Sequence, residues 1–308
     1  MHVPQPIRTP LLTALRRHRF RHADQIRRGL LTQYRVRPEF ENAPELPLTW
    51  WPKAPNFGDA LSPWLVHKMT GATVVRPDLS QPHYVAIGSV LRYARPKSIV
   101  WGTGCFGDEL DKDIPIEADY RAVRGPLTRQ KIRNAGGRCP KVYGDPALLA
   151  PLYYWPEVKK THEIGLVLRW SEQRWKEAEV DPAVRIIDLG TDDVEGVIDA
   201  MLSCRRIVTS SLHGLVIADA YGMPSAWLDS RSPKGGEFKF HDYFLSVQKI
   251  RSSVRFDPTS QAVTTEALRR KFTFDDRALQ FSYRPLLDAC PFLERIPAGA
   301  STNGHHPS

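Results

Sequence analysis

The stretch from residue 206 to residue 228 constrains the fold of this chain most strongly, because it predicts a strand, a helix and a second strand in direct succession. Residues 206–209, with Ile207 and Val208 at their centre, predict a short buried strand, and residues 215–221 form a helical pattern with apolar side chains on almost every face. Gly222 ends that helix, and residues 224–228 predict the next strand. This unit places His213 at the N-terminus of a buried helix.

The turn before this helix carries Ser210, Ser211, His213 and Gly214. Free backbone N–H groups and the positive end of the helix dipole favour an anion at such a position. The turn therefore predicts a phosphate-binding site beside His213, whose imidazole can transfer a proton. A second interpretation stays open, in which the serines only cap the helix and His213 only packs against its neighbours.

Short strands and helices alternate along most of the remaining chain. Strands separated by helices of about ten residues are typical of βαβ units with parallel sheets. The sequence therefore predicts an α/β fold of two Rossmann-like domains that face a cleft. The predicted strands cover residues 48–51, 84–87, 98–101, 120–123, 142–143, 164–169 and 184–189, and the predicted helices cover residues 60–70, 126–133, 172–178 and 193–204.

A chain of 308 residues is long for one ordinary domain and suits two. Prolines and a Lys-Lys pair in residues 151–161 predict the linker, and the polar, glycine-rich residues 229–237 predict a mobile loop over the cleft. We expect a basic N-terminal arm over residues 1–45, an N-terminal Rossmann-like domain over 46–156, a C-terminal Rossmann-like domain over 157–260, a helical segment over 261–297 and a disordered tail over 298–308.

Small and polar residues stand at the turns next to these elements, where open α/β sheets bind ligands. Neither glycine turn completes a G-x-G-x-x-G pattern, so dinucleotide binding is only weakly indicated. The turn residues are Asn56, Gly58 and Asp59 before the helix at 60–70, Gly88 and Ser89 after one strand, Gly102, Thr103 and Gly104 after the next, and Asp145 near the end of the first half.

The four cysteines lie far apart and form no C-x-x-C pair, which indicates a reducing cytoplasm and not a disulfide framework. No cluster of side chains has the spacing of a metal site, so no metal is expected. No apolar run reaches the roughly 18 to 20 residues of a membrane span. We therefore expect a cytoplasmic protein that is soluble or peripheral to the membrane.

The net charge of +9 comes mainly from the N-terminal arm, where nine arginines between residues 8 and 37 face only Asp24 and Glu39. Leucines and Ile26 give this arm a broken apolar face, so it predicts a basic amphipathic helix on an anionic membrane surface. Nucleic acid is not expected as a partner, because no zinc-finger, RNA-binding or helix-turn-helix signature accompanies the charge. A transit peptide and a solvated helix packed on its own domain stay open.

Taken together, these motifs resemble the polysaccharide pyruvyltransferase family, in particular its exopolysaccharide ketal-pyruvate transferase type. The resemblance covers about residues 48 to 245, and each motif is weak alone, whereas seven in order are specific. The motifs are Asn56-Phe-Gly-Asp59, Gly88-Ser89, Trp101-Gly-Thr-Gly104, Arg121-Ala-Val-Arg-Gly-Pro-Leu-Thr128, Gly144-Asp-Pro146, Ser210-Ser-Leu-His-Gly214 and Lys239-Phe-His-Asp242.

The resemblance implies a glycosyltransferase-B-like pair of Rossmann domains. It also implies transfer of pyruvate from phosphoenolpyruvate, as co-substrate and without a cofactor, onto two hydroxyls of one sugar as a ketal. The implied acceptor is a lipid-linked oligosaccharide or polysaccharide repeat unit at the inner face of the cytoplasmic membrane. Many family members have an arginine two residues before the histidine, where this chain has Ser211. One anion contact is therefore supplied differently or is absent.

Phosphoenolpyruvate carries a phosphate and a carboxylate, so its site needs cationic side chains and backbone N–H groups. His213 is the first candidate for acid or base and Asp59 the second, without a choice between the two roles. The candidates for donor binding are Arg121, Arg124, Ser210, Ser211, Gly214 and Lys239, and those for the cleft and acceptor are Asn56, Gly58, Gly88, Ser89, Gly102, Thr103, Gly104 and Asp145.

Each assignment has a structural alternative. The arginines could be solvated at the surface, Asp59 and Asp145 could only cap helices or turns, and Lys239 and Asp242 could form a surface ion pair. Two other functions also stay open, a sugar-nucleotide-dependent glycosyltransferase of the same fold and a non-catalytic protein that binds sugar phosphates.

Overall fold

The computed structural model describes residues 29–30, 32–51, 53–169, 171–172, 175, 178–229, 236–258 and 260–297. The expected arm helix up to residue 28, residues 230–235 of the predicted mobile loop, and the tail from residue 298 lie outside the described residues. Contacts group the chain into a large unit over residues 36–293 and a small one that comprises residues 1–35 and 294–308. The small unit includes the ion pair between Arg35 Nε and Glu294 Oε1, at 2.6 Å.

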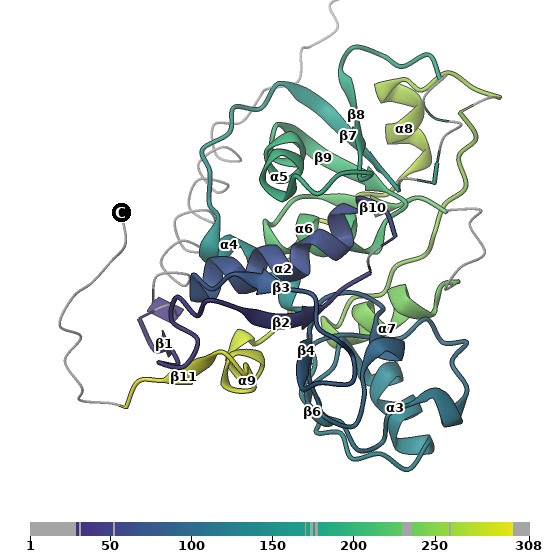
Figure 1. Cartoon of the computed structure of the whole chain (residues 1–308). Coiled ribbons are helices and arrows are strands. Elements are labelled where there is room, and N and C mark those ends of the chain that lie inside the picture. Colours follow the sequence, from purple (N-terminus) through teal and green to yellow (C-terminus); the bar gives the residue numbers. More distant parts are fainter. Residues whose placement is uncertain are drawn as a thin grey trace, which may run out of the picture. The chain divides into compact units, whose positions relative to one another are not determined.

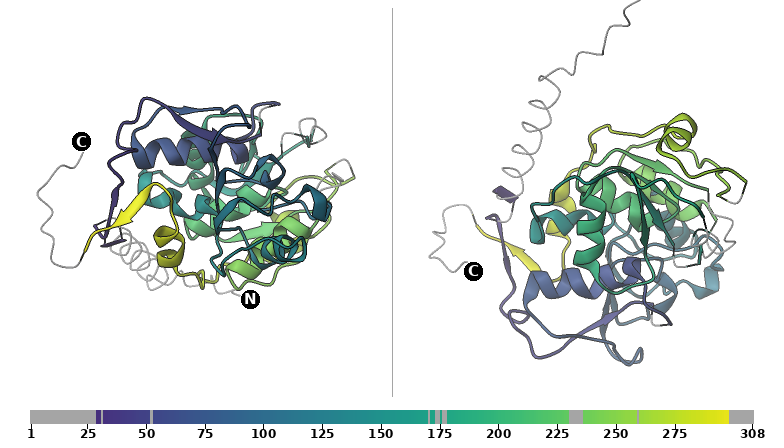
Figure 2. Two further views of the ribbon diagram at one scale, coloured as in Figure 1. Left: turned by 60° about the horizontal axis from the view of Figure 1, so that its bottom comes forward. Right: turned by 90° about the horizontal axis from the view of Figure 1, so that it is seen from above.

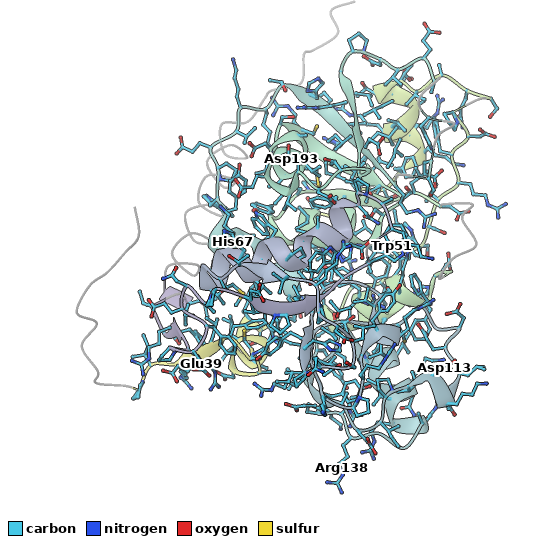
Figure 3. The ribbon with its side chains drawn as sticks, in the orientation of Figure 1. Glu39, Trp51, His67, Asp113, Arg138 and Asp193 are labelled. Atoms are coloured by element: carbon cyan, nitrogen blue, oxygen red, sulfur yellow. The ribbon has the colours of Figure 1, made fainter. Side chains whose placement is uncertain are left out.

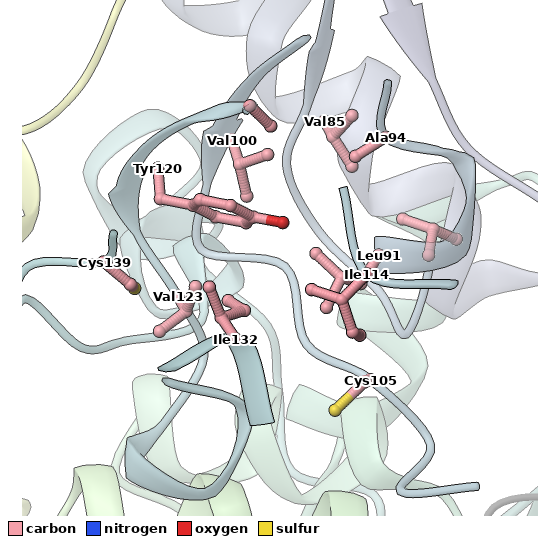
Figure 4. Close-up of a cluster of buried hydrophobic side chains, with 12 residues drawn as sticks. Val85, Leu91, Ala94, Val100, Cys105, Ile114, Tyr120, Val123, Ile132 and Cys139 are labelled. Carbon is pink, nitrogen blue, oxygen red and sulfur yellow. The ribbon is translucent and has the colours of Figure 1, made fainter. Parts of the chain in front are cut away.

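The first sheet of the large unit has five parallel strands in the order β3-β2-β4-β5-β6 (Figure 1). Inward side chains of β4, β5 and β6, such as Val85, Val100 and Tyr120, form a buried apolar cluster with Val123 and Ile132 (Figure 4). The strands are β2 (Leu46–Thr49), β3 (Val74–Val75), β4 (His83–Val85), β5 (Ser98–Trp101) and β6 (Asp119–Ala122).

The second sheet has four parallel strands in the order β10-β9-β7-β8. The central strand β7 is buried along residues 164–168, which explains its continuous apolar sequence. A second apolar cluster, which includes Ile164, Leu166, Trp175 and Val208, lies against this sheet. The strands are β7 (His162–Leu168), β8 (Val184–Asp188), β9 (Cys204–Thr209) and β10 (Ser225–Trp227).

Helices connect and cover the strands. Helix α2 begins where the Asn56 side chain accepts a hydrogen bond from Gly58 N, and it ends at Gly71, whose φ of 73° suits glycine. The helices are α2 (Phe57–Thr70), α3 (Pro126–Asn134), α4 (Ala150–Tyr153), α5 (Val194–Leu202), α6 (Leu212–Ala220), α7 (Phe238–Ser246), α8 (Thr265–Lys271) and α9 (Tyr283–Asp288), with 3₁₀ turns η1 (Leu91–Tyr93), η2 (Asp111–Asp113) and η3 (Pro146–Leu149).

Helix α2 lies between the two sheets and contacts β3 on one side and α5 and α6 on the other (Figure 1). The C-terminal segment returns to the first sheet, where Trp101 Nε1 donates a hydrogen bond of 2.9 Å to the Leu286 carbonyl. Phe292 adds an aromatic contact with Tyr84 at 4.8 Å between ring centroids. Strands β11 (Leu293–Arg295) and β1 (Tyr34–Val36) pair with each other in a two-stranded sheet, and Figure 2 shows these two strands side by side.

The structure confirms the α/β fold with parallel sheets, whereas the arrangement of two glycosyltransferase-B-like domains around a cleft stays a prediction. The predicted linker at 151–161 is wrong at its start, because Pro151 and Leu152 are buried in α4. Proline at the first helical turn is compatible with a helix, since its missing N–H would have no partner there. Of the predicted helix at 172–178, the structure describes only Glu172, Trp175 and Ala178.

Among the described helices, none has the length and apolar character needed to cross a lipid bilayer.

Candidate active site

His213 lies in the first turn of α6, directly after β9, and its side chain is almost buried. Its Nε2 atom lies 3.5 Å from Asp145 Oδ2, and neither atom has a hydrogen-bond partner among the described residues. The other oxygen, Asp145 Oδ1, accepts from Ala147 N at the start of η3, so the expected capping role is confirmed. Because one oxygen is held by the cap, the second is directed at the imidazole.

Glycines let the backbone approach closely on both sides of this histidine. A Cβ atom on Gly58 would overlap the His213 ring, and a Cβ atom on Gly214 would overlap the Thr209 hydroxyl. Ser211 occupies the N-cap of α6, but its side chain makes no capping hydrogen bond to the described residues. The Ser210 hydroxyl accepts from Arg169 N at 3.3 Å. The turn at 210–214 therefore joins α2, β7 and α6 around His213.

Asp59 lies in the first turn of α2 and is partly buried. Burial raises the pKa of its carboxyl from 3.8 to about 6, and the charge of Asp192 adds to this rise. The positive charges of His213 and Lys239 act in the opposite direction. Asp59 thus lies near both of these side chains, with a pKa close to neutral pH.

Lys239 lies in the first turn of α7, near the rings of Phe106 and Phe240 at 5.6 and 5.5 Å from the ring centroids. Burial lowers the pKa of its ammonium group to about 7. The charges of Arg169 and Arg124 lower it further, and Asp59 opposes them. Lys239 therefore belongs to the same charge cluster as Asp59.

Arg169 was not among the residues predicted from the sequence. It directly follows β7, is partly buried, and lies 4.0 Å from Glu172 through its Nη2 atom. Its charge acts on Lys239, which places it in the cluster. Its position at the carboxyl end of a buried strand was the available signal, because ligands bind at that edge of an open α/β sheet.

Arg124 is placed inside the protein, and its guanidinium contacts three protein acceptors. Nε donates to Asp242 Oδ2 at 3.2 Å, Nη1 to Ser89 Oγ at 2.8 Å and Nη2 to the Cys105 carbonyl at 2.8 Å. The side chains of Arg124 and Asp242 are both 0% exposed. The flat face of the guanidinium lies against Gly104, where a Cβ atom would overlap it. Whether Arg124 also contacts a donor stays a prediction.

Asp242 receives further hydrogen bonds from the start of α3. Its Oδ1 accepts from Leu127 N and Thr128 N, and its Oδ2 accepts from the Thr128 hydroxyl at 2.6 Å. Gly125, the N-cap of α3, supplies no side chain, so a residue of α7 caps this helix instead. The surface ion pair between Lys239 and Asp242 is therefore wrong, because Asp242 is buried and pairs with Arg124.

Arg121 lies away from this cluster. On β6 its Nε donates to Asp119 Oδ2 of the same strand at 3.0 Å, and its charge acts on Tyr84 and Cys290.

The predicted glycine turns follow two neighbouring strands, β4 and β5, and contact each other. Gly88 and Gly102 have φ angles of 109° and 89°, and Thr103 Oγ1 donates to the Gly88 carbonyl at 2.7 Å.

The structure therefore brings His213, Asp145, Asp59, Lys239 and Arg169 together at the carboxyl ends of both sheets. The Asp59 carboxyl and the Lys239 ammonium group have pKa values near neutral pH, so each can accept or donate a proton there. The cationic side chains of the cluster can bind an anion. Within the described residues, no group of three or more His, Cys, Asp or Glu side chains is placed to hold a metal ion.

A model of the polysaccharide pyruvyl transferase family matches residues 58–232, which is more than half of the chain. The chain belongs to the polysaccharide pyruvyl transferase family. The matched residues include Asp59, Asp145, Arg169 and His213 and end before Lys239. Four of the five clustered side chains thus lie inside the region that defines this family.

Two curated proteins are similar to this family member. The succinoglycan biosynthesis protein ExoV of Rhizobium meliloti is 31% identical over 234 residues, which cover 72% of this chain and 69% of ExoV. The uncharacterised protein L143 of Acanthamoeba polyphaga mimivirus is 29% identical over 216 residues, which cover 66% and 74% of the two chains. A solved structure of a functionally uncharacterised protein from Klebsiella pneumoniae has 10% identity and a TM-score of 0.41, with 69% of this chain and 93% of that chain covered.

Proposed function

We propose that this protein transfers pyruvate from phosphoenolpyruvate onto two hydroxyls of one sugar in a polysaccharide repeat unit, forming a ketal, in exopolysaccharide biosynthesis. The family supports the transfer of pyruvate to a polysaccharide. The observation that carries the proposal is the cluster of His213, Asp59 and Lys239, which combines proton-transfer groups with cations.

The reaction requires two new carbon–oxygen bonds and the loss of phosphate. Both sugar oxygens bond to the central carbon of phosphoenolpyruvate, and the bond from this carbon to the phosphate oxygen breaks. The methylene carbon gains one proton and becomes a methyl group. Of the two protons lost by the sugar hydroxyls, one balances this gain and the other leaves with phosphate. An active site therefore needs a base for the hydroxyls and an acid for the methylene carbon.

In this proposal Asp59 accepts the hydroxyl proton, because a carboxylate with a pKa of about 6 is ionised at neutral pH and still basic. His213 delivers the proton to the methylene carbon. Asp145, 3.5 Å from His213 Nε2, orients the imidazole. These roles separate the two candidates that the sequence left unassigned.

Lys239 and Arg169 bind the phosphate and carboxylate of the donor, together with backbone N–H groups at the N-terminus of α6. Many family members have an arginine at the position of Ser211, and in this proposal Arg169 supplies that anion contact instead. Arg169 lies beside the same turn, because its backbone N donates to the Ser210 hydroxyl. Arg124 positions α7 and its Lys239 through Asp242.

The test is incubation of the purified protein with phosphoenolpyruvate and a soluble oligosaccharide repeat unit. We expect release of phosphate, a product mass that corresponds to one added pyruvate ketal, and a new methyl signal in the proton spectrum. Turnover of a nucleotide sugar in place of phosphoenolpyruvate would identify a glycosyltransferase of the same fold. Binding of donor without any product would identify a non-catalytic protein.

The proposal includes a cytoplasmic location, with recruitment to the inner face of the cytoplasmic membrane through the N-terminal arm. Seven of its arginines lie within residues 1–28. Basic residues near an anionic leaflet contribute about 1 kcal/mol each at low salt, so a few of them suffice for reversible binding. Recruitment would concentrate the enzyme near a lipid-linked acceptor.

A further inference from the structure

A pocket of about 210 Å³ lies at the carboxyl ends of β2 and β3. Trp50 and Trp51 directly follow β2, and Arg76 directly follows β3. Asp192, from the loop after β8, completes the wall from the second sheet. The carboxyl edge of parallel strands is where open α/β sheets bind ligands, so the position of this pocket suits a substrate.

Two aromatic side chains, Trp50 and Trp51, line the pocket. The Arg76 guanidinium lies over the Trp50 ring at 4.5 Å from the ring centroid, which holds both side chains in place. Trp51 is half-buried and packs against the apolar cluster drawn in Figure 4, while it also lines the pocket. Figure 3 shows Trp51 between the two sheets and Arg138 at a distant end of the unit.

The pocket shares one residue with the charge cluster. Asp59 lines the pocket and also interacts with His213 and Lys239. Asp192 is fixed there, because its Oδ1 accepts from Asn56 N at 3.2 Å. A ligand in this pocket therefore meets the Asp59 carboxyl, together with the cationic side chains of Lys53 and Arg76 that also line the pocket.

We propose that this pocket binds the acceptor sugar as a single uncharged pyranose ring, whose apolar face lies on Trp51 and whose hydroxyls point to Asp59. Aromatic walls with a few polar groups are typical of such sites. The volume is below the roughly 300 to 1,000 Å³ of pockets for drug-sized ligands, so it suits one sugar ring better than a nucleotide sugar. The role of the bound sugar as pyruvate acceptor rests on the proposed function, whereas its binding does not.

The test measures binding of methyl glycosides of glucose, galactose and mannose to the full chain by saturation-transfer NMR. We expect at least one glycoside to bind the natural protein, with tenfold or weaker binding to Trp51→Leu and several-fold weaker binding to Arg76→Ala. Trp155→Leu and Arg138→Ala are the matched controls, because neither residue lines the pocket. Affinity for phosphoenolpyruvate, measured by calorimetry, should be unchanged in all four variants.

Unchanged glycoside binding in both pocket variants would overturn the inference, as would the absence of binding by all three glycosides to the natural protein. If Trp51→Leu fails to fold, the Arg76→Ala variant provides the test, because the Arg76 side chain is exposed. Glycoside binding that depends on the pocket, together with failure of phosphoenolpyruvate as donor, would refute the proposed function and leave the sugar site standing.

Discussion

His213 Nε2 lies 3.5 Å from Asp145 Oδ2, and the two residues come from different halves of the chain. Both atoms are buried, and neither has a hydrogen-bond partner among the described residues. A proton on Nε2 would therefore lie between the two groups. We therefore expect the pairing of His213 with Asp145, and not the helix N-terminus alone, to govern proton transfer by the histidine.

Removing the imidazole should abolish proton transfer and leave the fold intact. We expect His213→Ala to lower kcat by about a hundredfold or more, the scale of a positioned acid or base. Asp145→Asn should lower kcat by a smaller factor and leave KM for phosphoenolpyruvate unchanged, because it acts through His213. His241→Ala, an exposed histidine of α7, is the control and should keep full activity. Normal turnover of a folded His213→Ala protein would return this residue to a packing role.

The activity should follow a bell-shaped pH profile. Asp59, with a pKa of about 6, loses its basic form as the pH falls through 6, and Lys239, with a pKa of about 7, loses its charge as the pH rises through 7. We expect kcat/KM for phosphoenolpyruvate to fall on both sides of this range. Lys239→Arg should move the alkaline limb upward, since a guanidinium keeps its charge. An unchanged alkaline limb in that variant would exclude Lys239 as its cause.

Asp59 should reduce stability at neutral pH. Folding raises its pKa from 3.8 to about 6, so the folded state favours the protonated carboxyl. The contribution of Asp59 to the free energy of unfolding is therefore most favourable below pH 4 and is lost as the pH rises through 6. We expect Asp59→Asn to stabilise the protein by about 1 to 2 kcal/mol at pH 8, with little gain at pH 4, after allowance for its partial exposure. Denaturant unfolding at both pH values measures this difference. The exposed Asp108→Asn should change neither value.

Removal of the Arg124 side chain should lower the free energy of unfolding more than removal of the Arg121 side chain. Arg124→Ala leaves the buried Asp242 carboxylate without its ion pair, and we expect a loss of about 3 to 5 kcal/mol of unfolding free energy. Arg121→Ala removes a partly exposed pair with Asp119 and should cost no more than about 1 kcal/mol. Chemical denaturation compares the two variants. Equal stability of both, with donor affinity lost only in Arg124→Ala, would instead assign Arg124 to donor binding.

The arm should control membrane binding separately from catalysis. We expect the full chain to sediment with vesicles that contain anionic lipid, to remain in solution with neutral vesicles, and to be released by salt. A chain that starts at residue 29 should lose sedimentation and keep activity on a soluble acceptor. Continued sedimentation of the shortened chain would exclude the arm as the membrane contact.

The α/β pattern could be predicted because it is local. Strand β5 spans Ser98–Trp101 as predicted, and α2, α5 and α6 differ from their predicted bounds by a few residues. Helix α7 was not predicted, because its aromatic residues pack between distant segments and give no clear helical period. Its first turn carries Lys239, which the sequence analysis named as a donor-binding candidate without predicting the helix that holds it.

The candidate site could be predicted only in part for the same reason. His213 and Asp59 are recognisable from turns next to regular elements. The pairing of Asp145 with His213 and the position of Arg169 depend on how two sheets meet, and no short stretch of sequence contains that information. The burial of Arg124 depends likewise on Asp242, which lies 118 residues away.

The cap that Asp242 provides for α3 has a consequence for how this chain can diverge. The first turn of α3 and its preceding Arg124 take their acceptor from the other half of the chain, so neither half contains a complete set of partners. A chimera that joins the first half of one family member to the second half of another would keep this ion pair only where both parents carry the arginine and the aspartate. Substitutions at positions 124 and 242 should therefore become established as pairs, and the two halves should be inherited together and not exchanged as modules.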